Sequence, residues 1–309
     1  MTDAPRDVET DPAFATRVEH DSSTGRPVLV APNRAVRPLH TVTGRDHAAV
    51  CPFCQGAEGQ TPPERDAVRP AATDPDTPGW RVRAFPNLYP AARWHEVVAE
   101  GPEHESRPSR LDAALWVDVL TVWRRRLAFL EAQDEVACGF LFKNVGREAG
   151  ASVAHNHSQV LGLPMVPPRL VEERARAEDS GSLPGPELAD AAGDGRLVFE
   201  TDHFAVFAPR HPRLPDATWL APKDPFDVFD EGRHAAELAE LLARWTGAVD
   251  AALGPRPFNF WLSRIPDERF HWHFEIQPRT GFLAGLELGA DVYINARSPV
   301  ETAARMRDA

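Results

Sequence analysis

The segment "GASVAHNHSQVLGLP" (Gly150–Pro164) places His155, His157 and Gln159 at alternate positions. Successive side chains of a β-strand point to opposite faces, so a strand here would carry all three polar groups on one face. A neutral imidazole can attack phosphorus or bind a metal, and an amide can donate an N–H to a phosphoryl oxygen. The spacing leaves two interpretations open: a strand that presents polar residues to solvent, and a catalytic face.

The motif "CPFC" brings Cys51 and Cys54 within reach of one ion. Such a pair is also found as a redox couple or as two ordinary thiols, so a zinc interpretation needs two further ligands. His104 and His155 lie outside obvious apolar faces and are the candidates, which gives a closed Cys2His2 site of structural type. The chain has three cysteines and no export signal, which argues against a disulfide scaffold.

Two further groups of residues are suited to binding phosphate. Asn144, Gly146 and Ser152, in "KNVGREAGAS", would let backbone N–H groups approach a phosphate closely. Arg34 and Arg37, in "APNRAVRP", would clamp phosphates through bidentate hydrogen bonds. An ordinary turn and two solvated arginines explain the same residue types equally well.

A second His-x-His pair, His271 and His273 in "HWHFE", stands near the end of the chain. With Glu173 as a carboxylate ligand it would form a second metal site. A buried strand with hydrogen-bonded histidines is the alternative.

The regular elements that must position these groups occur twice in the same order: strand, strand, long helix, strand, His-x-His strand. Leucine and valine recur at helical spacing between Ser109 and Asp134, and a second helix is predicted over Glu231–Leu253. Alternating apolar residues predict strands over Trp80–Pro90, Trp94–Gly101, Cys138–Gly146, His155–Pro164, Asp202–Pro212, Asp216–Asp224, Pro257–Pro266 and Phe270–Arg279. The range Gly25–Pro38 reads as a short strand that leads into an arginine-bearing turn. The pattern indicates an α+β fold made of two duplicated halves.

Composition suggests how the chain is divided and which functions it excludes. Residues 1–20 read as a flexible tail, 21–177 as an N-terminal half, 178–195 as a Gly/Pro-rich linker and 196–309 as a C-terminal half. Of the 309 residues, 42% are hydrophobic, and the net charge is −12, which argues against a broad nucleic-acid-binding face. No apolar run is long enough to span a bilayer, so we expect a cytoplasmic protein without a membrane partner.

Taken together, the motifs resemble the galactose-1-phosphate uridylyltransferase family, a duplicated branch of the histidine-triad superfamily. The likeness covers about residues 25–308 and rests on "VLVAPNRAVRP", "CPFC", "HEVVAEGPEH", "KNVGREAGASVAHNHSQ" and "HWHFEIQPR". It implies two histidine-triad-like halves forming an extended, mainly antiparallel sheet flanked by helices, structural zinc, and a homodimer.

The activity implied by the resemblance is ping-pong transfer of a nucleotide from a nucleoside diphosphate sugar to a sugar phosphate. His157 would attack the α-phosphorus and form a covalent nucleotidyl-histidine, while Gln159 stabilises the phosphoryl oxygens. His104 and His155 would complete the zinc site of Cys51 and Cys54. The resemblance also implies substrate contacts for Arg34, Arg37, Asn87, Asn144, Ser152 and Glu287.

The sequence departs from the best-known members around the nucleophile, in the second metal site, and in the C-terminal sugar-reading segment, where Leu286 and Tyr293 replace polar groups beside Glu287. Asn156 and Ser158 replace their proline and glycine around the nucleophile, and Ser158 is shared with ADP-glucose phosphorylase-like relatives. Ser263 stands where some members have a metal-binding histidine, so we expect a weak or absent second metal site. The alternatives to a uridylyltransferase are an ADP-sugar phosphorylase that uses the same histidine, a zinc-stabilised nucleotide-binding protein without turnover, and a nucleotide hydrolase.

Overall fold

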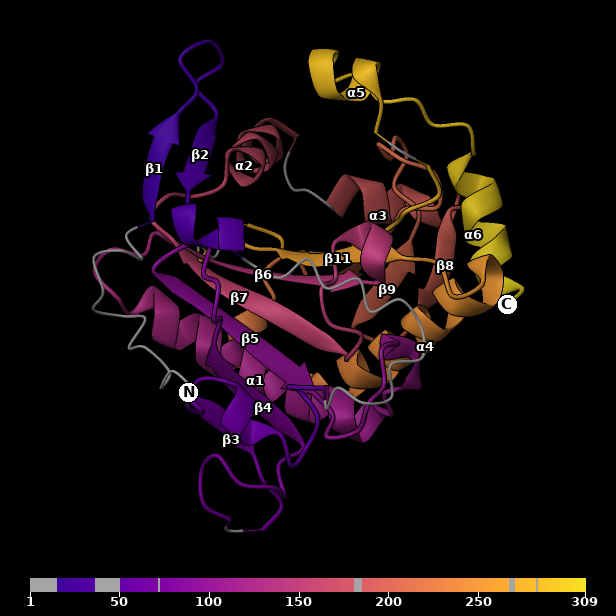
Figure 1. Ribbon diagram of the computed structural model, residues 1–309. Coiled ribbons are helices and arrows are strands. Elements are labelled where there is room, and N and C mark those ends of the chain that lie inside the picture. The colour runs from indigo at the N-terminus through magenta and orange to yellow at the C-terminus, as the bar shows by residue number, and fades with distance from the viewer. Residues whose placement is uncertain (1–15, 37–50, 72, 181–184, 267–269, 282) are drawn as a thin grey trace. The chain divides into compact units, whose positions relative to one another are not determined.

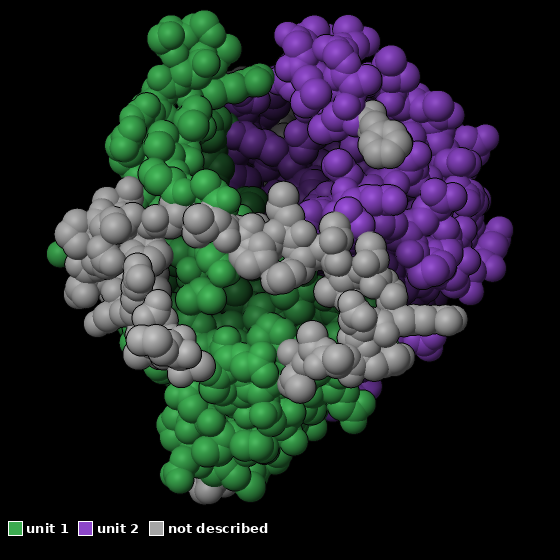
Figure 2. All heavy atoms as spheres, viewed as in Figure 1, with its two compact units in different colours: residues 1–106, 121–141, 152–168 green, residues 107–120, 142–151, 169–309 purple. Residues whose placement is uncertain are grey.

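A computed structural model describes residues 16–36, 51–71, 73–180, 185–266, 270–281 and 283–309. The expected fold class is confirmed: helices flank mainly antiparallel sheet strands. The chain forms two compact units, each built from several segments (Figure 2). Unit 1 consists of residues 1–106, 121–141 and 152–168, and unit 2 of residues 107–120, 142–151 and 169–309.

Unit 1 is organised around five neighbouring strands, of which the fifth, β6, continues into unit 2. Their order is β3 (Asp66–Val68), β4 (Val82–Pro86), β5 (Trp94–Glu100), β7 (His157–Leu163) and β6 (Cys138–Val145). Strands β4, β5 and β7 are antiparallel neighbours. The two central strands carry almost entirely buried side chains, so both of their faces are covered.

The faces of β5 and β7 differ in what covers them. On one face lies helix α1 (Ala113–Glu131) (Figure 1). Its residue Trp123 donates its indole N–H to the Ser158 hydroxyl at 2.6 Å, and Arg126 forms a buried bidentate ion pair with Glu96. Because strand side chains alternate, His157 and Gln159 point to the opposite face. There the residues of an apolar cluster, Trp80, Phe85, Val97 and Ala99, form a floor with Phe53 packed against it.

A short hairpin, β1 (Arg17–His20) and β2 (Pro27–Val30), precedes a 3-10 turn that carries Arg34. Of the predicted tail over residues 1–20, residues 17–20 form β1 and pair with β2, and residues 1–15 lie outside the described residues. The polar sequence "RVEH" makes backbone ladder hydrogen bonds that its composition does not reveal.

Unit 2 contains the second set of strands, in an order that repeats the first. The strands β9 (Phe204–Phe207), β10 (Thr218–Pro222), β12 (His273–Pro278) and β11 (Phe258–Ser263) correspond to β4, β5, β7 and β6. The strand β8 (Leu197–Glu200) lies at the edge, as β3 does in unit 1. Helix α4 (Ala235–Leu253) corresponds to α1, and its Trp245 donates to the Thr218 hydroxyl at 2.9 Å. The predicted duplication is therefore present in the strand order.

The remaining helices are α2 (Pro168–Ser180), α3 (Gly185–Ala191), α5 (Gly285–Ala290) and α6 (Pro299–Arg307). The predicted linker over residues 178–195 contains the end of α2 and the helix α3, and residues 181–184 lie outside the described residues. Ala191 is fully buried against Phe207 and Ala221, with Leu188 packed beside them. Helical spacing of Leu188 and Ala191 gives this Gly/Pro-rich stretch an apolar face.

None of the described helices combines the length and the apolar character needed to cross a membrane.

Candidate active site

The first His-x-His pair does not lie wholly on a strand, in contrast to the expectation that residues 155, 157 and 159 share one face. Strand β7 begins at His157, and His155 lies in the bend before it. Both rings are buried. The bend turns His155 toward the cysteine pair, whereas His157 and Gln159 keep the alternation of the strand. The two histidines can therefore do different work.

His157 is held in one tautomer by the backbone of the preceding bend. Its Nδ1 lies 2.7 Å from the carbonyl oxygen of His155, so Nδ1 carries the proton and donates it there. The lone pair is then on Nε2. The ring contacts the Phe53 ring edge-on, with centroids 5.2 Å apart. This is the protonation state that a histidine nucleophile requires.

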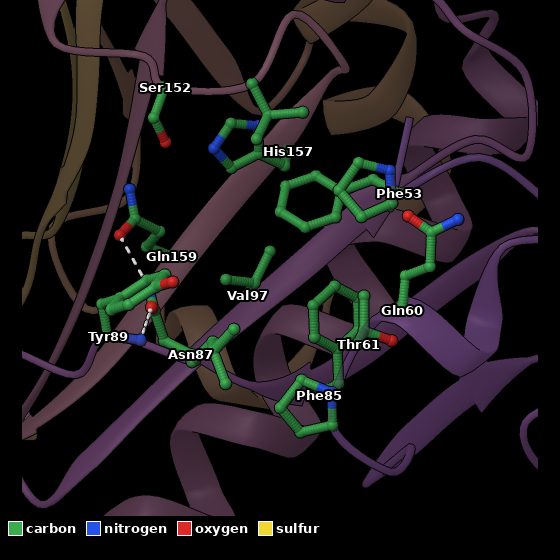
Figure 3. A pocket seen from close by; sticks show the side chains of 14 residues that line it. Phe53, Gln60, Thr61, Phe85, Asn87, Tyr89, Val97, Ser152, His157 and Gln159 are labelled. Carbon is green, nitrogen blue, oxygen red and sulfur yellow. Dashed lines mark hydrogen bonds between the residues drawn. The ribbon is translucent and has the colours of Figure 1, made fainter. Parts of the chain in front are cut away.

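Gln159 is oriented by hydrogen bonds to its carbonyl oxygen. His95 Nε2 lies 2.9 Å from Gln159 Oε1. Asn87 Nδ2 approaches the same atom at 3.4 Å (Figure 3). The backbone N–H of Tyr89 in turn fixes Asn87 by donating to its Oδ1 at 2.9 Å. With both bonds made to the oxygen, the amide N–H groups of Gln159 are the donors left for a ligand.

A pocket of about 220 Å³ opens beside these residues, entirely within unit 1. Figure 3 shows His157, Gln159 and Ser152 along one side, and Phe53, Phe85 and Val97 across from them. One part of the lining is therefore polar and the other is aromatic and apolar. This pairing suits a ligand that has a flat apolar ring joined to a charged group.

The predicted metal ligands Cys51, Cys54, His104 and His155 are brought together, with all four ligand atoms within 4.8 Å of one another. Cys54 Sγ lies 3.5 Å from His104 Nδ1 and 3.6 Å from His155 Nδ1, and Cys51 Sγ lies 3.9 Å from His155 Nδ1. Zinc–sulfur bonds of about 2.3 Å and zinc–nitrogen bonds of about 2.0 Å, at a tetrahedral angle, separate sulfur from nitrogen by about 3.5 Å. The group therefore has the donor set and the spacing of a tetrahedral zinc site.

Two further observations fit a cation at this position. His155 Nε2 donates to the Gly101 carbonyl at 2.9 Å, which leaves its Nδ1 lone pair facing the thiols. Burial, together with the neighbouring Cys51 thiol, raises the pKa of Cys54 to about 12. A bound divalent cation is what allows two adjacent thiolates to form at neutral pH.

The substrate-binding residues predicted from sequence fall into three groups. Asn87 and Ser152 line the pocket, and Arg34 donates to the carbonyl of the pocket residue Tyr89 at 2.7 Å. Arg37 lies outside the described residues. Asn144 and Glu287 belong to unit 2, whereas the pocket belongs to unit 1.

Within unit 2, local contacts account for the positions of both of these residues. Asn144 Oδ1 accepts from Asn259 Nδ2 at 2.8 Å. The Glu287 carboxylate accepts from the Ala284 N–H at 2.9 Å, within the N-terminal cap of α5. Their predicted contacts with substrate remain predictions.

The second His-x-His pair is arranged differently. Glu173, His273 and Glu275 form a group whose ligand atoms lie within 4.8 Å, but His271 is not part of it. The Arg169 guanidinium forms ion pairs with both Glu173 and Glu275. A single protein cation thus pairs with both carboxylates, and the expectation of a weak or absent second metal site stays a prediction.

Sequence reasoning missed Phe53, Phe85 and His95. Phe53 lies between the two cysteines of "CPFC" and Phe85 lies in the strand predicted over Trp80–Pro90, so neither has a pattern of its own that marks a pocket residue. His95 is the sole polar residue on the face that it shares with Val97 and Ala99 of β5. A histidine on an otherwise apolar strand face was the available signal.

Comparison with known proteins bears on the identity of this chain. A solved "galt-like protein" from Arabidopsis thaliana is 30% identical, with a TM-score of 0.74 over 84% of this chain and 91% of that one. The chain belongs to the galactose-1-phosphate uridylyltransferase family. The family's N-terminal domain model, "Galactose-1-phosphate uridyl transferase, N-terminal domain", matches residues 94–167, which include β5, α1, β6 and β7. The protein is accordingly an enzyme of the nucleotidyltransferase class.

Two other family members cover nearly the whole chain. The crystal structure of an ADP-glucose phosphorylase from Arabidopsis thaliana with bound ADP-glucose is 29% identical, with a TM-score of 0.74 over 96% of this chain and 99% of that one. A galactose-1-phosphate uridylyltransferase from Thermotoga maritima is 26% identical over 84% of this chain and 89% of its own length. The family therefore contains more than one reaction.

The departure from the best-known family members at Ser158 has a packing explanation. Ser158 is fully buried on the α1 side of β7, where it accepts the Trp123 indole N–H. Its side chain points away from the pocket face of the strand. The residue between His157 and Gln159 is thus matched to α1 and not to the pocket.

Proposed function

We propose that this enzyme transfers a nucleotide from a nucleoside diphosphate sugar to a phosphate-bearing acceptor, through a covalent intermediate on His157. The observation that carries the proposal is the hydrogen bond from His157 Nδ1 to its own chain at the mouth of a half-aromatic pocket. In the neutral ring this bond places the proton on Nδ1 and the lone pair on Nε2, the nitrogen that would attack phosphorus. The family membership supports this reaction class.

In the first half-reaction, His157 Nε2 forms a bond to the α-phosphorus as the bond from that phosphorus to the bridging oxygen breaks. The sugar 1-phosphate leaves with the bonding electron pair. The Gln159 amide and the Ser152 hydroxyl donate to the nonbridging oxygens, whose charge is redistributed in the transition state. The nucleobase lies among Phe53, Phe85 and Val97.

In the second half-reaction, a phosphate oxygen of the acceptor attacks the same phosphorus and the bond to nitrogen breaks. His157 regains its lone pair and its neutral state. Gln159 cannot act as a general base, because an amide has no basic group that titrates near neutral pH. The site therefore favours transfer to an acceptor over activation of water.

The metal that we propose for the four Cys and His ligands is structural zinc. When bound, zinc neutralises the thiolates and closes the loop that contains Phe53. Phe53 contacts the His157 ring, and His155 supplies both a ligand nitrogen and the carbonyl that fixes the His157 tautomer. The ligand set thus positions the nucleophile without touching the substrate.

An adenylyl donor with inorganic phosphate as acceptor is a second candidate. It is favoured by the ADP-glucose phosphorylase that matches 96% of the chain at 29% identity. A uridylyl donor with a hexose 1-phosphate acceptor is favoured by the Thermotoga relative. Both reactions use the same histidine and differ in the base and the acceptor.

The test is covalent labelling with UDP-glucose or ADP-glucose that carries the label on its α-phosphate. We expect a stoichiometric, acid-labile adduct with one of the two donors, which disappears when the matching acceptor is added. His157→Ala should abolish the adduct. The matched control is His273→Ala, which removes the equivalent ring of the second half and should leave labelling intact.

Other outcomes would reject the proposal. Binding of nucleotide without labelling would indicate a nucleotide-binding protein without turnover. Steady release of nucleoside monophosphate without any acceptor would indicate a hydrolase. Labelling of the His157→Ala variant would mean that another group is the nucleophile.

A further inference from the structure

We infer that His95 is a positioning residue that acts through Gln159. This inference rests on the function proposed above. His95 does not line the pocket, whereas Gln159 and Asn87 do. Its ring is nonetheless buried, with 4% of its surface exposed, on the same face of the sheet as Gln159. Its role is to determine which end of the Gln159 amide meets the phosphate.

The position of His95 follows from the register of β5 and β7. Val97 is paired with Gln159, and His95 with Leu161, so His95 and Gln159 are diagonal neighbours. Diagonal pairs on one face of an antiparallel sheet lie within reach of long side chains. The observed distance of 2.9 Å between Nε2 and Oε1 is that of a good hydrogen bond.

The tautomer of His95 is determined at its other nitrogen. The backbone N–H of Ala91 donates to His95 Nδ1 at 2.9 Å, so Nδ1 must be unprotonated. A neutral ring then carries its proton on Nε2. Two groups approach this nitrogen, the Gln159 carbonyl oxygen at 2.9 Å and Asn87 Nδ2 at 3.2 Å, and only the oxygen can accept the proton. The Gln159 carbonyl is thereby turned toward His95, and the Gln159 NH2 group is turned toward the ligand.

The consequence concerns both binding and rate. A glutamine amide flipped by 180° would present its oxygen to a negatively charged phosphoryl group and repel it. His157 and His95 hold opposite tautomers on neighbouring strands, with the proton on Nδ1 in the first and on Nε2 in the second. A backbone group fixes each tautomer: the His155 carbonyl accepts from His157, and the Ala91 N–H donates to His95.

Two variants separate the two hydrogen bonds of His95. In His95→Gln the new amide nitrogen takes the place of Nε2 and can still donate to Gln159. In His95→Asn the side-chain oxygen takes the place of Nδ1 and can still accept from Ala91, but no donor reaches Gln159. We expect labelling to be within about threefold of wild type for His95→Gln and to fall about tenfold for His95→Asn.

The decisive measurement is a double-mutant cycle with Gln159→Ala. Because His95 acts through Gln159, His95→Asn should change the labelling rate less than twofold when Gln159 is absent. An equal tenfold loss in both backgrounds would overturn the inference and leave His95 with a general structural role. Equal losses for His95→Gln and His95→Asn would overturn it as well. Thermal unfolding and metal content identify any variant that has lost its fold.

A readout independent of turnover keeps this inference separate from the proposed function. In protein labelled with 15N-histidine, the resonance lost in His95→Gln should have the pattern of a neutral ring protonated on Nε2. The pattern of protonation on Nδ1 would contradict the inference even if labelling proceeds. If wild-type protein forms no adduct, the proposed function fails, and the tautomer of His95 still decides the positioning role.

Discussion

The two His-x-His strands share a backbone design but differ in the residue that follows them. His155 and His271 each donate from Nε2 to a carbonyl, at 2.9 and 2.8 Å. His157 and His273 each place Nδ1 near the carbonyl two residues earlier, at 2.7 and 3.4 Å. Four positions after the first histidine, however, β7 has the neutral amide Gln159 and β12 the carboxylate Glu275.

The environment of Glu275 shows what this difference means. Burial alone would raise the pKa of Glu275, yet the Arg169 guanidinium and the His273 ring lower it to about 2. Trp261 and Ser263 also donate to one of its oxygens, at 2.9 and 3.0 Å. An ionised carboxylate repels a phosphate and has no N–H to offer. The comparison indicates that the second strand keeps the backbone geometry of the first but carries no amide donor at this position.

The largest expected effect comes from making the first strand resemble the second at this position. Gln159→Glu replaces two N–H donors by a negative charge, so we expect covalent labelling to fall at least about 100-fold. The rate of adduct formation measures it. The reciprocal Glu275→Gln should leave that rate unchanged per folded molecule. Equal rates for Gln159→Glu and wild type would show that the amide does not contact the phosphoryl group.

The order of elements could be predicted from sequence because each has a strong local pattern. In α1 the pattern is the helical spacing of apolar residues such as Leu127 and Leu130, and in β6 it is the alternation of apolar residues. Both elements lie within the ranges predicted for them. The short helix α3 was missed because Leu188 and Ala191 are only two apolar residues in a Gly/Pro-rich stretch. Their burial depends on Phe207, which is a long-range contact that local composition does not carry.

The site shows the same division between local and long-range information. The grouping of Cys51 and Cys54 with His104 and His155 could be predicted because two thiols and two imidazoles form the ligand set of a structural zinc site. His95 could not, since its partner Gln159 is 64 residues away and becomes a neighbour only through the register of β5 and β7. The bend at His155 was also missed: alternation suggested a continuous strand, whereas the cysteine pair lies off the strand axis.

A metal test sharpens the comparison, because all four predicted zinc ligands belong to the first half and the second half has no cysteine. We expect one zinc per chain by elemental analysis. Cys51→Ser should lose most of it and lower Tm by about 10 °C, since a structural metal contributes several kcal/mol to folding. Cys138→Ser changes a buried thiol outside the ligand group and should keep the metal. Full zinc content in Cys51→Ser would contradict the assignment.

The smallest expected effect is a pH dependence that belongs to the second half. Burial lowers the pKa of His271 to about 4, although its hydrogen bond to the Pro222 carbonyl and the neighbouring Asp224 act in the opposite direction. The unfolded chain, with a pKa of about 6.5, therefore takes up a proton first as the pH falls. The stabilisation by neutral His271 is complete above about pH 6.5 and is lost progressively down to about pH 4, with about 2 kcal/mol lost between pH 7 and pH 5.

Urea unfolding at pH 7 and at pH 5 measures this loss in the free energy of unfolding. His271→Gln, which keeps a donor but has no titrating group, should remove about that much of the difference. An unchanged difference in this variant would assign the pH dependence to other groups.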